Sequence, residues 1–253
     1  MFDLHTHLIG HQDRPANREN IQEYLEAARR AGLQGIGFSD HDMYFEDLDL
    51  PLIREVAKGY PDLKVRVGLE VDYRVEDEAK IQALLQTFPF DYVIGSVHEI
   101  GSWLFDYPDQ AQKHREEDPD RLYLTYFDLV EKAAQSQLFT TIGHFDLIKL
   151  FGVRPRTDVR DLAENALRAI AENGLVAELN TAGRYKPVAE FYPEEKLIRE
   201  MVNRGIEFTV GSDAHEARFV GRDLKEGVQI LQACGVKRLI HFEQRKRLAF
   251  SLS

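Results

Sequence analysis

Short apolar segments alternate with amphipathic helical patterns along nearly the whole chain, and this alternation restricts the fold more than any other feature. The apolar segments have the length of buried strands, and most of them end in a polar or charged residue. We expect strands near residues 2–4, 35–38, 64–69, 92–97, 139–143, 175–179 and 206–210. Strands separated by helices in this way form parallel sheets, so the chain is predicted to be an α/β protein.

Helical patterns fill the intervals between these segments. They cover residues 21–28, 51–60, 76–87, 121–136, 159–173, 193–204, 224–234 and 243–250, with a short apolar segment at 238–240 and a longer insertion at 100–119. About seven strand–helix units without a Pro-, Gly- or Ser-rich linker predict one domain over residues 1–253. That number favours a barrel related to the (β/α)8 type, with a doubly wound open sheet as the alternative.

Two histidines close the first strand, and similar residues follow the later ones. Because residues i and i+2 of an extended chain face the same side, His5 and His7 can offer two imidazoles to one ion. The other strand-end residues are Asp40, His41, Glu70, His98, His144, Asp213 and His215. The carboxyl ends of barrel strands meet at one mouth, so six histidines at equivalent positions predict a metal site. The leftover His114 and His241 are expected to be solvated or packing residues.

Nitrogen and oxygen ligands without a thiolate suit zinc, manganese or iron and do not choose among them. The strand ends offer more ligands than one four-coordinate ion can use, which indicates two or three divalent ions that share a bridging carboxylate. Glu70 is the best-placed bridge. Ions close together would orient a phosphoryl group and activate a water molecule.

The charge and the cysteine count limit the partners and the compartment. A formal net charge of −11 argues against nucleic acid or an anionic membrane as a partner, but not against a small anionic substrate held by metal ions. Cys234 is the only cysteine, so no intrachain disulfide can form. The chain has neither a signal-peptide pattern nor an apolar run of about 20 residues, and we expect a cytoplasmic protein. The oligomeric state stays open.

The strand-end motifs occur in an order that resembles the polymerase-and-histidinol-phosphatase (PHP) family. The motifs are His5-Thr6-His7, Ser39-Asp40-His41, Gly68-Leu69-Glu70, Gly95-Ser96-Val97-His98, Gly143-His144 and Gly211-Ser212-Asp213-Ala214-His215. The resemblance covers almost the whole chain. It implies a distorted (β/α)7 barrel, TIM-barrel-like, that holds a trinuclear metal centre and hydrolyses phosphate esters.

The resemblance also implies a ligand set. The first ion would be held by His5, His7, Glu70 and Asp213, the second by Glu70, His98 and His144, and the third by His41, His215 and a residue of the first loop. Two residues can supply that loop ligand. Asp13 stands six positions after His7, the usual family spacing, whereas Gly10-His11 resembles the Gly-His of histidinol phosphatases, and His11 is slightly preferred. Asp40 is expected to orient an imidazole.

Further stretches resemble the histidinol-phosphatase branch. They include the segments 103–106, 143–149 and 154–155, and the motif that runs from Glu178 to Pro187, in which the arginine stands one place earlier than is usual. Arg154 and Arg184 are candidate phosphate ligands, because a guanidinium binds phosphate with two parallel hydrogen bonds. Trp103 can cover the pocket, stack on a substrate ring or pack in the core.

The resemblance to this branch implies a metal-dependent phosphomonoesterase of histidine biosynthesis that acts on L-histidinol phosphate. A hydroxide held by the metals would attack phosphorus, and Glu70, Asp213 and His215 are the candidate catalytic residues, with Asp213 or His215 protonating the leaving alcohol. Three alternatives remain: a phosphatase of nucleotides or sugar phosphates, a non-catalytic metal-binding regulatory barrel, and a metal-dependent amide hydrolase.

Overall fold

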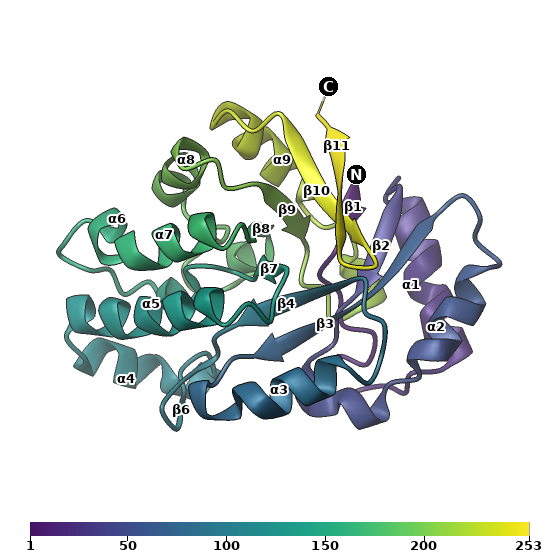
Figure 1. Ribbon diagram of the computed structural model, residues 1–253, viewed down its shortest axis with the longest axis horizontal. Coiled ribbons are helices and arrows are strands. Elements are labelled where there is room, and N and C mark those ends of the chain that lie inside the picture. The colour runs from purple at the N-terminus through teal and green to yellow at the C-terminus, as the bar shows by residue number, and fades with distance from the viewer. Residues whose placement is uncertain (253) are drawn as a thin grey trace.

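A mostly parallel sheet lies at the centre of the protein, and helices surround it (Figure 1). The computed structural model describes residues 1–252. In spatial order the strands are β1 (Phe2–Asp3), β2 (Gly35–Phe38), β3 (Lys64–Asp72), β4 (Tyr92–Ser96), β7 (Thr141–Ile142), β8 (Val176–Asn180), β9 (Phe208–Gly211), β10 (Arg238–Glu243) and β11 (Lys246–Ser251). Neighbouring strands from β1 to β10 are parallel, and β11 alone runs antiparallel to its neighbour. The predicted α/β class is confirmed.

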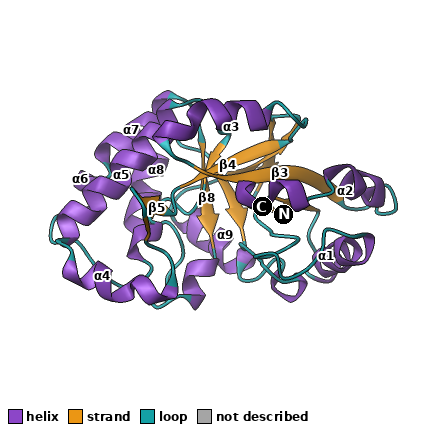
Figure 2. Cartoon of the chain, turned by 90° about the horizontal axis from the view of Figure 1, so that it is seen from below, coloured by secondary structure: helices purple, strands orange, loops and turns teal. Residues whose placement is uncertain are grey.

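The helices lie on either side of the strands in the view from below (Figure 2). They are α1 (Arg18–Arg30), α2 (Leu50–Ala57), α3 (Glu78–Leu85), α4 (Ala111–Glu116), α5 (Pro119–Gln135), α6 (Val159–Leu162), α7 (Glu164–Glu172), α8 (Glu195–Asn203) and α9 (Leu224–Ala233). The insertion after β4 also contains a two-stranded hairpin of β5 (Glu99–Ile100) and β6 (Trp103–Leu104). None of the helices described here is long and apolar enough to cross a membrane.

Helix α1 illustrates how the sequence sets these elements. Its N-cap Asn17 accepts a hydrogen bond from the backbone nitrogen of Asn20, and Ile21 and Leu25 are among the residues that it buries against the sheet. The chain leaves the helix at Gly32, whose φ of +70° is a left-handed conformation that glycine adopts without strain. The apolar spacing and the glycine therefore predicted this helix correctly.

Strands that are not neighbours in the sheet order are linked by side-chain contacts. The Tyr92 hydroxyl on β4 donates a hydrogen bond to the Leu4 carbonyl oxygen just after β1 (2.6 Å). Its ring fills space left by Gly37 and Gly68, where a Cβ atom would lie 2.2 Å and 2.4 Å from Tyr92. A small apolar cluster joins side chains from β1, β4, β8 and β10, and its members are Phe2, Leu4, Tyr92, Ile94, Val176, Ile240 and Phe242.

Backbone hydrogen bonds also connect the segment after β1 to the segment that ends β9. The Leu4 nitrogen donates to the Val210 oxygen (3.2 Å), and the His7 nitrogen donates to the Ala214 oxygen (2.9 Å). Thr6 and Ala214 form a parallel bridge. The first strand end of the chain therefore lies directly beside a strand end that follows about 200 residues later, and both carry residues of the predicted site.

The last helix predicted from the sequence, over residues 243–250, is wrong. This segment contains the turn and second strand of a hairpin, in which Glu243 of β10 pairs with Lys246 of β11. The turn residues Gln244 and Arg245 have φ values of 51° and 63°, as a type I′ turn requires. Pairing of β10 with β9 through Leu239 and Phe208 and burial of Phe242 outweigh the helical propensity of the segment.

Candidate metal centre

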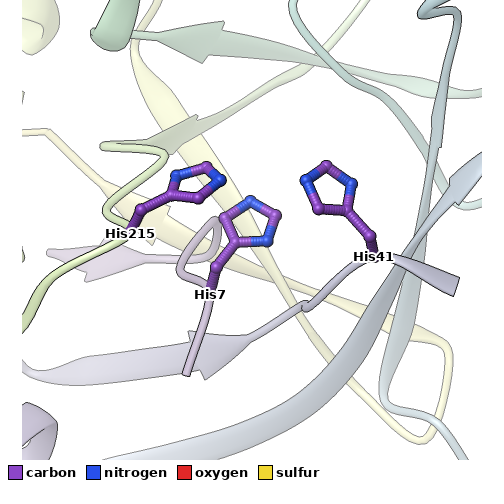
Figure 3. Close-up of side chains that lie close together, drawn as sticks. All are labelled: His7, His41 and His215. Carbon is purple, nitrogen blue, oxygen red and sulfur yellow. The ribbon is translucent and has the colours of Figure 1, made fainter. Parts of the chain in front are cut away.

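The strand-end histidines and carboxylates converge at the carboxyl ends of the parallel strands. Three of the rings, His7, His41 and His215, point toward one another in Figure 3 although they follow β1, β2 and β9. The ring centroid of His7 lies 4.4 Å from that of His41 and 4.1 Å from that of His215. The parallel register explains this meeting, because it brings all of these strand ends to the same edge.

Glu70 lies at the centre of the cluster and is almost fully buried. Its Oε2 atom is 3.0 Å from Nδ1 of His41, 3.2 Å from Nε2 of His5 and 3.5 Å from Nε2 of His7. The residue belongs to β3, and an isolated bridge pairs it with His41 in the segment that follows β2. One carboxylate oxygen thus faces imidazoles from two different strand ends.

The other oxygen of Glu70 faces a second pair of histidines. Oε1 is 2.9 Å from Nε2 of His144 and 3.6 Å from Nε2 of His98, and it accepts a hydrogen bond from the Ser96 hydroxyl (2.6 Å). The two oxygens therefore point into two groups of nitrogen atoms. A carboxylate in this position has the geometry to bridge two cations.

Asp213 approaches the cluster from the end of β9. Its Oδ1 atom is 3.1 Å from Nε2 of His7, 3.8 Å from Nε2 of His5 and 3.5 Å from Nδ1 of His215. Its φ of 55° is a left-handed conformation that costs free energy in any residue but glycine. Strain of this kind, held in place by surrounding hydrogen bonds, is typical of functional residues.

The residues fit divalent metal ions. Three overlapping groups have ligand atoms within 4.8 Å of one another: His5, His7 and Glu70; His41, Glu70 and His98; and His7, His41 and His215. Several of their buried atoms lack a hydrogen-bond partner within residues 1–252, namely Nε2 of His5, Nδ1 of His7, Oε2 of Glu70 and Nε2 of His215, and so does Nδ1 of the neighbouring His144. Unpaired buried nitrogen and oxygen atoms are costly unless a ligand satisfies them.

The electrostatics of the cluster require positive charge. Burial would raise the pKa of Glu70, but the neighbouring rings of His5 and His41 hold that pKa well below its usual range. Burial would lower the pKa of His98, but its contacts with Asp72 and Glu70 raise that pKa to about 10. The carboxylates also raise the pKa of His5 and His41, whereas burial lowers the pKa of His7 and His215. Positive charge is therefore favoured beside Glu70, and metal ions would supply it.

The first loop brings one of its two candidate ligands to the cluster. The ring centroid of His11 lies 4.4 Å from that of His215 and 5.6 Å from that of His41. Asp13 instead accepts a hydrogen bond from the His11 backbone nitrogen through Oδ2 (3.3 Å). Asp40 accepts one from the Ile9 backbone nitrogen (2.8 Å), so it holds the loop backbone rather than an imidazole.

The two predicted phosphate-binding arginines lie together in a pocket of about 830 Å³, whose lining includes none of the strand-end histidines. Arg154 contacts Glu190 (2.5 Å) and Glu194 (2.7 Å), and Arg184 forms a two-pronged ion pair with Glu226. Both guanidinium groups are therefore already paired with carboxylates.

Trp103 packs within the insertion. Its Nε1 atom donates to the Gln110 side-chain oxygen (2.9 Å), and its ring lies edge-on to the buried His114. Nζ of Lys113 lies 4.2 Å from the ring centroid. The expectation that His114 is a packing residue is confirmed by its complete burial and by its contact with the Phe105 carbonyl oxygen (2.8 Å).

Sequence reasoning assigned no role to three polar residues that touch the cluster. The Glu178 carboxylate lies 2.7 Å from Nδ1 of His5, Asn180 donates to Asp213 (3.2 Å), and Asp72 accepts a hydrogen bond from the His98 backbone nitrogen (3.1 Å). Each of them stands in the last residues of an apolar strand. Polar residues two positions apart in such a strand were the available signal, because they face the same side of the sheet.

Comparisons with known proteins agree with this geometry. The model of the PHP domain family matches residues 3–182. A protein of Deinococcus radiodurans named "probable histidinol-phosphatase" is 40% identical over 257 residues, which cover 96% of each chain. A histidinol-phosphatase of Lactococcus lactis is 27% identical, covering 97% of this chain and 94% of that one. A crystal structure of histidinol phosphate phosphatase from Lactococcus lactis, complexed with zinc, L-histidinol and phosphate, shares this fold with a TM-score of 0.74, at 22% identity and with 98% of each chain covered.

Proposed function

The chain belongs to the PHP domain family, and from this premise we propose that it is a metal-dependent phosphatase that hydrolyses L-histidinol phosphate to L-histidinol and phosphate. The observation that carries the proposal is the cluster of histidines around Glu70, in which Nε2 of His5, Nδ1 of His7, Oε2 of Glu70 and Nε2 of His215 are buried without a hydrogen-bond partner among residues 1–252. The name of the relative that is 40% identical supports the choice of substrate.

We propose a trinuclear centre with the ligands that the family pattern implies. His5, His7, Glu70 and Asp213 would hold one ion, Glu70, His98 and His144 the second, and His41, His215 and His11 the third. The two-sided environment of Glu70 supports its role as the bridge, and the closeness of the His11 ring to the rings of His215 and His41 supports His11 over Asp13. Zinc, manganese and iron all accept this donor set.

When bound, the ions would supply positive charge for the phosphoryl oxygens and lower the pKa of a water molecule. The residues of this chain would hold the ions in place and supply a proton. Glu70 holds its two groups of nitrogen atoms in fixed relation, because its burial and the Ser96 hydrogen bond leave it no freedom to turn. Asp213 and His215 lie side by side after β9, and we propose that one of them gives a proton to the departing alcohol oxygen.

Arg154 and Arg184 are proposed to bind phosphate after release from their glutamate partners. The segment 181–194 supports this, because it borders both regions: Phe191 lines the arginine pocket, while the ring of Tyr192 lies 6.4 Å from that of His144. Trp103 would act less directly, by packing the insertion that carries Asp106.

The fold that we propose for this function is a distorted (β/α)7 barrel formed by one domain over residues 1–253. Three observations support closure of the sheet: the backbone bonds between the segments after β1 and around β9, the Tyr92 hydrogen bond to Leu4, and the small apolar cluster. We also propose a cytoplasmic location, since the single cysteine, Cys234, is buried and free.

The choice of substrate is tested by comparing two phosphomonoesters. Histidinol phosphate carries an ammonium group and an imidazole opposite its phosphate, and Asp106, whose Oδ1 atom is buried without a partner in the described chain, can receive the cationic end. We expect kcat/KM for histidinol phosphate to exceed that for a nucleoside monophosphate at least ~100-fold, equivalent to roughly 2.7 kcal/mol.

Phosphate release by the metal-loaded enzyme measures this ratio, with the chelated enzyme as the blank. A preference within about tenfold, or the reverse order, would exclude histidinol phosphate as the substrate and leave a phosphatase of another small phosphomonoester.

A further inference from the structure

We propose that Glu178 and Asn180 on β8 are positioning residues that orient the ligands of β1 and β9 toward the metal ions. The inference rests on the proposed metal centre and extends it to a strand that supplies no ligand. Both side chains are fully buried at the carboxyl end of β8, between the strand ends that carry His5, His144 and Asp213.

Glu178 fixes the proton of His5. A carboxylate can only accept hydrogen bonds, so the 2.7 Å contact between Oε1 of Glu178 and Nδ1 of His5 assigns the hydrogen to Nδ1. Nε2 of His5 is then directed at Glu70 Oε2 (3.2 Å) and Asp213 Oδ1 (3.8 Å), in the interior of the cluster. A carboxylate that holds the far nitrogen of a metal-binding imidazole sets its tautomer and increases its basicity.

The second oxygen of Glu178 ties the neighbouring strands together. Oε2 accepts hydrogen bonds from the His144 backbone nitrogen (3.0 Å) and from Nδ2 of Asn180 (3.2 Å). The Asn180 amide also donates to Asp213 Oδ2 (3.2 Å), and its oxygen accepts from the Ala182 backbone nitrogen (2.9 Å). Asn180 thereby helps to hold Asp213 in its left-handed conformation, with Oδ1 turned to the histidines.

The end of β9 leaves room for this arrangement. A Cβ atom on Gly211 would lie 2.2 Å from Oε1 of Glu178 and 2.4 Å from Cβ of His5. Any side chain at Gly211 would therefore displace the carboxylate or the imidazole. The glycine of the strand-end motif is explained by the close approach of these two groups rather than by its backbone conformation.

Replacement of Glu178 by glutamine separates positioning from simple support of the fold. A glutamine has the same size but only one acceptor oxygen, and its NH2 group must face either His5 Nδ1–H or the donors of His144 and Asn180. We expect Glu178→Gln to weaken the affinity for Zn²⁺ by about 10–100-fold, measured by competition with a chelator. In ¹H–¹⁵N spectra of the zinc-loaded protein, the strongly deshielded Nδ1 proton of His5 should be lost.

Glu207→Gln is the matched control. Within the described residues, Glu207 forms ion pairs with Arg238 and Arg247 only, and it directly precedes β9, at the end of that strand away from the metal centre. It should bind Zn²⁺ as the wild type does. If Glu178→Gln does not fold, Glu178→Asp serves in its place, because it keeps the charge but shortens the reach toward His5. A folded variant with unchanged Zn²⁺ affinity, or with reduced Zn²⁺ affinity but an unchanged His5 proton signal, overturns the inference. These readouts need no substrate, so a wild type that binds Zn²⁺ but does not hydrolyse histidinol phosphate refutes the proposed function alone.

Discussion

Glu70 faces five imidazoles, whereas Asp213, the other carboxylate among the candidate ligands of the cluster, faces three. Its charge matters more than its shape, because a neutral amide of the same size cannot balance two cations. We expect Glu70→Gln to lose at least one metal ion per chain and several orders of magnitude in turnover. Elemental analysis of the dialysed protein and single-substrate kinetics measure both effects, and full metal content with near-normal turnover would refute the bridging role.

The first loop offers a second comparison at the scale of single residues. The ring of His11 lies 4.4 Å from that of His215, whereas Asp13 accepts a hydrogen bond from the loop backbone, so His11 is the better-placed candidate ligand for the third group. His11→Ala should lower the metal content of the protein, and Asp13→Ala should leave it nearly unchanged. The opposite result would show that the six-residue spacing identifies the ligand better than the ring geometry does.

The sequence predicted the candidate metal ligands but not the side-chain contacts that hold them. The histidines and acids at strand ends could be predicted, because each stands after an apolar segment and parallel strands end at one edge. Glu178 and Asp72 could not be assigned roles, since their contacts with His5 and His98 depend on which strands become neighbours and on how far each side chain reaches. The ion pairs of Arg154 with Glu190 and of Arg184 with Glu226 could not be predicted either, because they also depend on which elements become neighbours.

Among the predicted elements, the segment 243–250 is the one whose type was predicted wrongly: it is part of the β10–β11 hairpin and not a helix. Its second strand reads Lys-Arg-Leu-Ala-Phe-Ser, with several good helix formers, and its turn lacks the Asn-Gly pair that usually announces a hairpin. Tertiary contacts decide the outcome: the backbone nitrogens of Gln244 and Arg245 donate to Oδ1 and the carbonyl oxygen of Asp91 (3.0 and 2.8 Å). Such distant partners leave no local signature.

A change in the turn of this hairpin should make the protein more stable. Gln244 and Arg245 both adopt positive φ, which costs free energy in residues with a Cβ atom. Replacing the pair by Asn-Gly keeps the backbone donors to Asp91 and should raise the free energy of unfolding by about 1 kcal/mol. Chemical denaturation measures the change. Lys246→Gly, in the extended strand, is the control and should be destabilising, and an Asn-Gly variant no more stable than wild type would contradict the strain argument.

The cluster joins strand ends from β1 to β9. Metal ions bound to it should therefore hold these strands together and stabilise the folded molecule. Ions that bind only the folded chain stabilise it by about 2.7 kcal/mol when their free concentration is 100 times the dissociation constant. We expect chelation to lower the melting temperature by several degrees and Zn²⁺ or Mn²⁺ to restore it, whereas Ca²⁺, which prefers oxygen ligands, should not. Calorimetry at constant pH tests this, and an unchanged melting temperature after verified metal removal would contradict it.

The contact between His7 and Asp213 spans 206 residues, and this separation has a consequence for biosynthesis. A ribosome adds roughly 5–20 residues per second, so roughly 10–40 s pass between the emergence of His7 and that of Asp213. During this interval His5 and His7 have left the ribosome, but Asp213, the Ala214 carbonyl group that binds the His7 backbone, and strand β9 have not yet been made. The centre can therefore be completed only after the segment that follows β9 has been synthesised, and a nascent chain stalled before β9 would carry most of the histidines and bind metal only loosely.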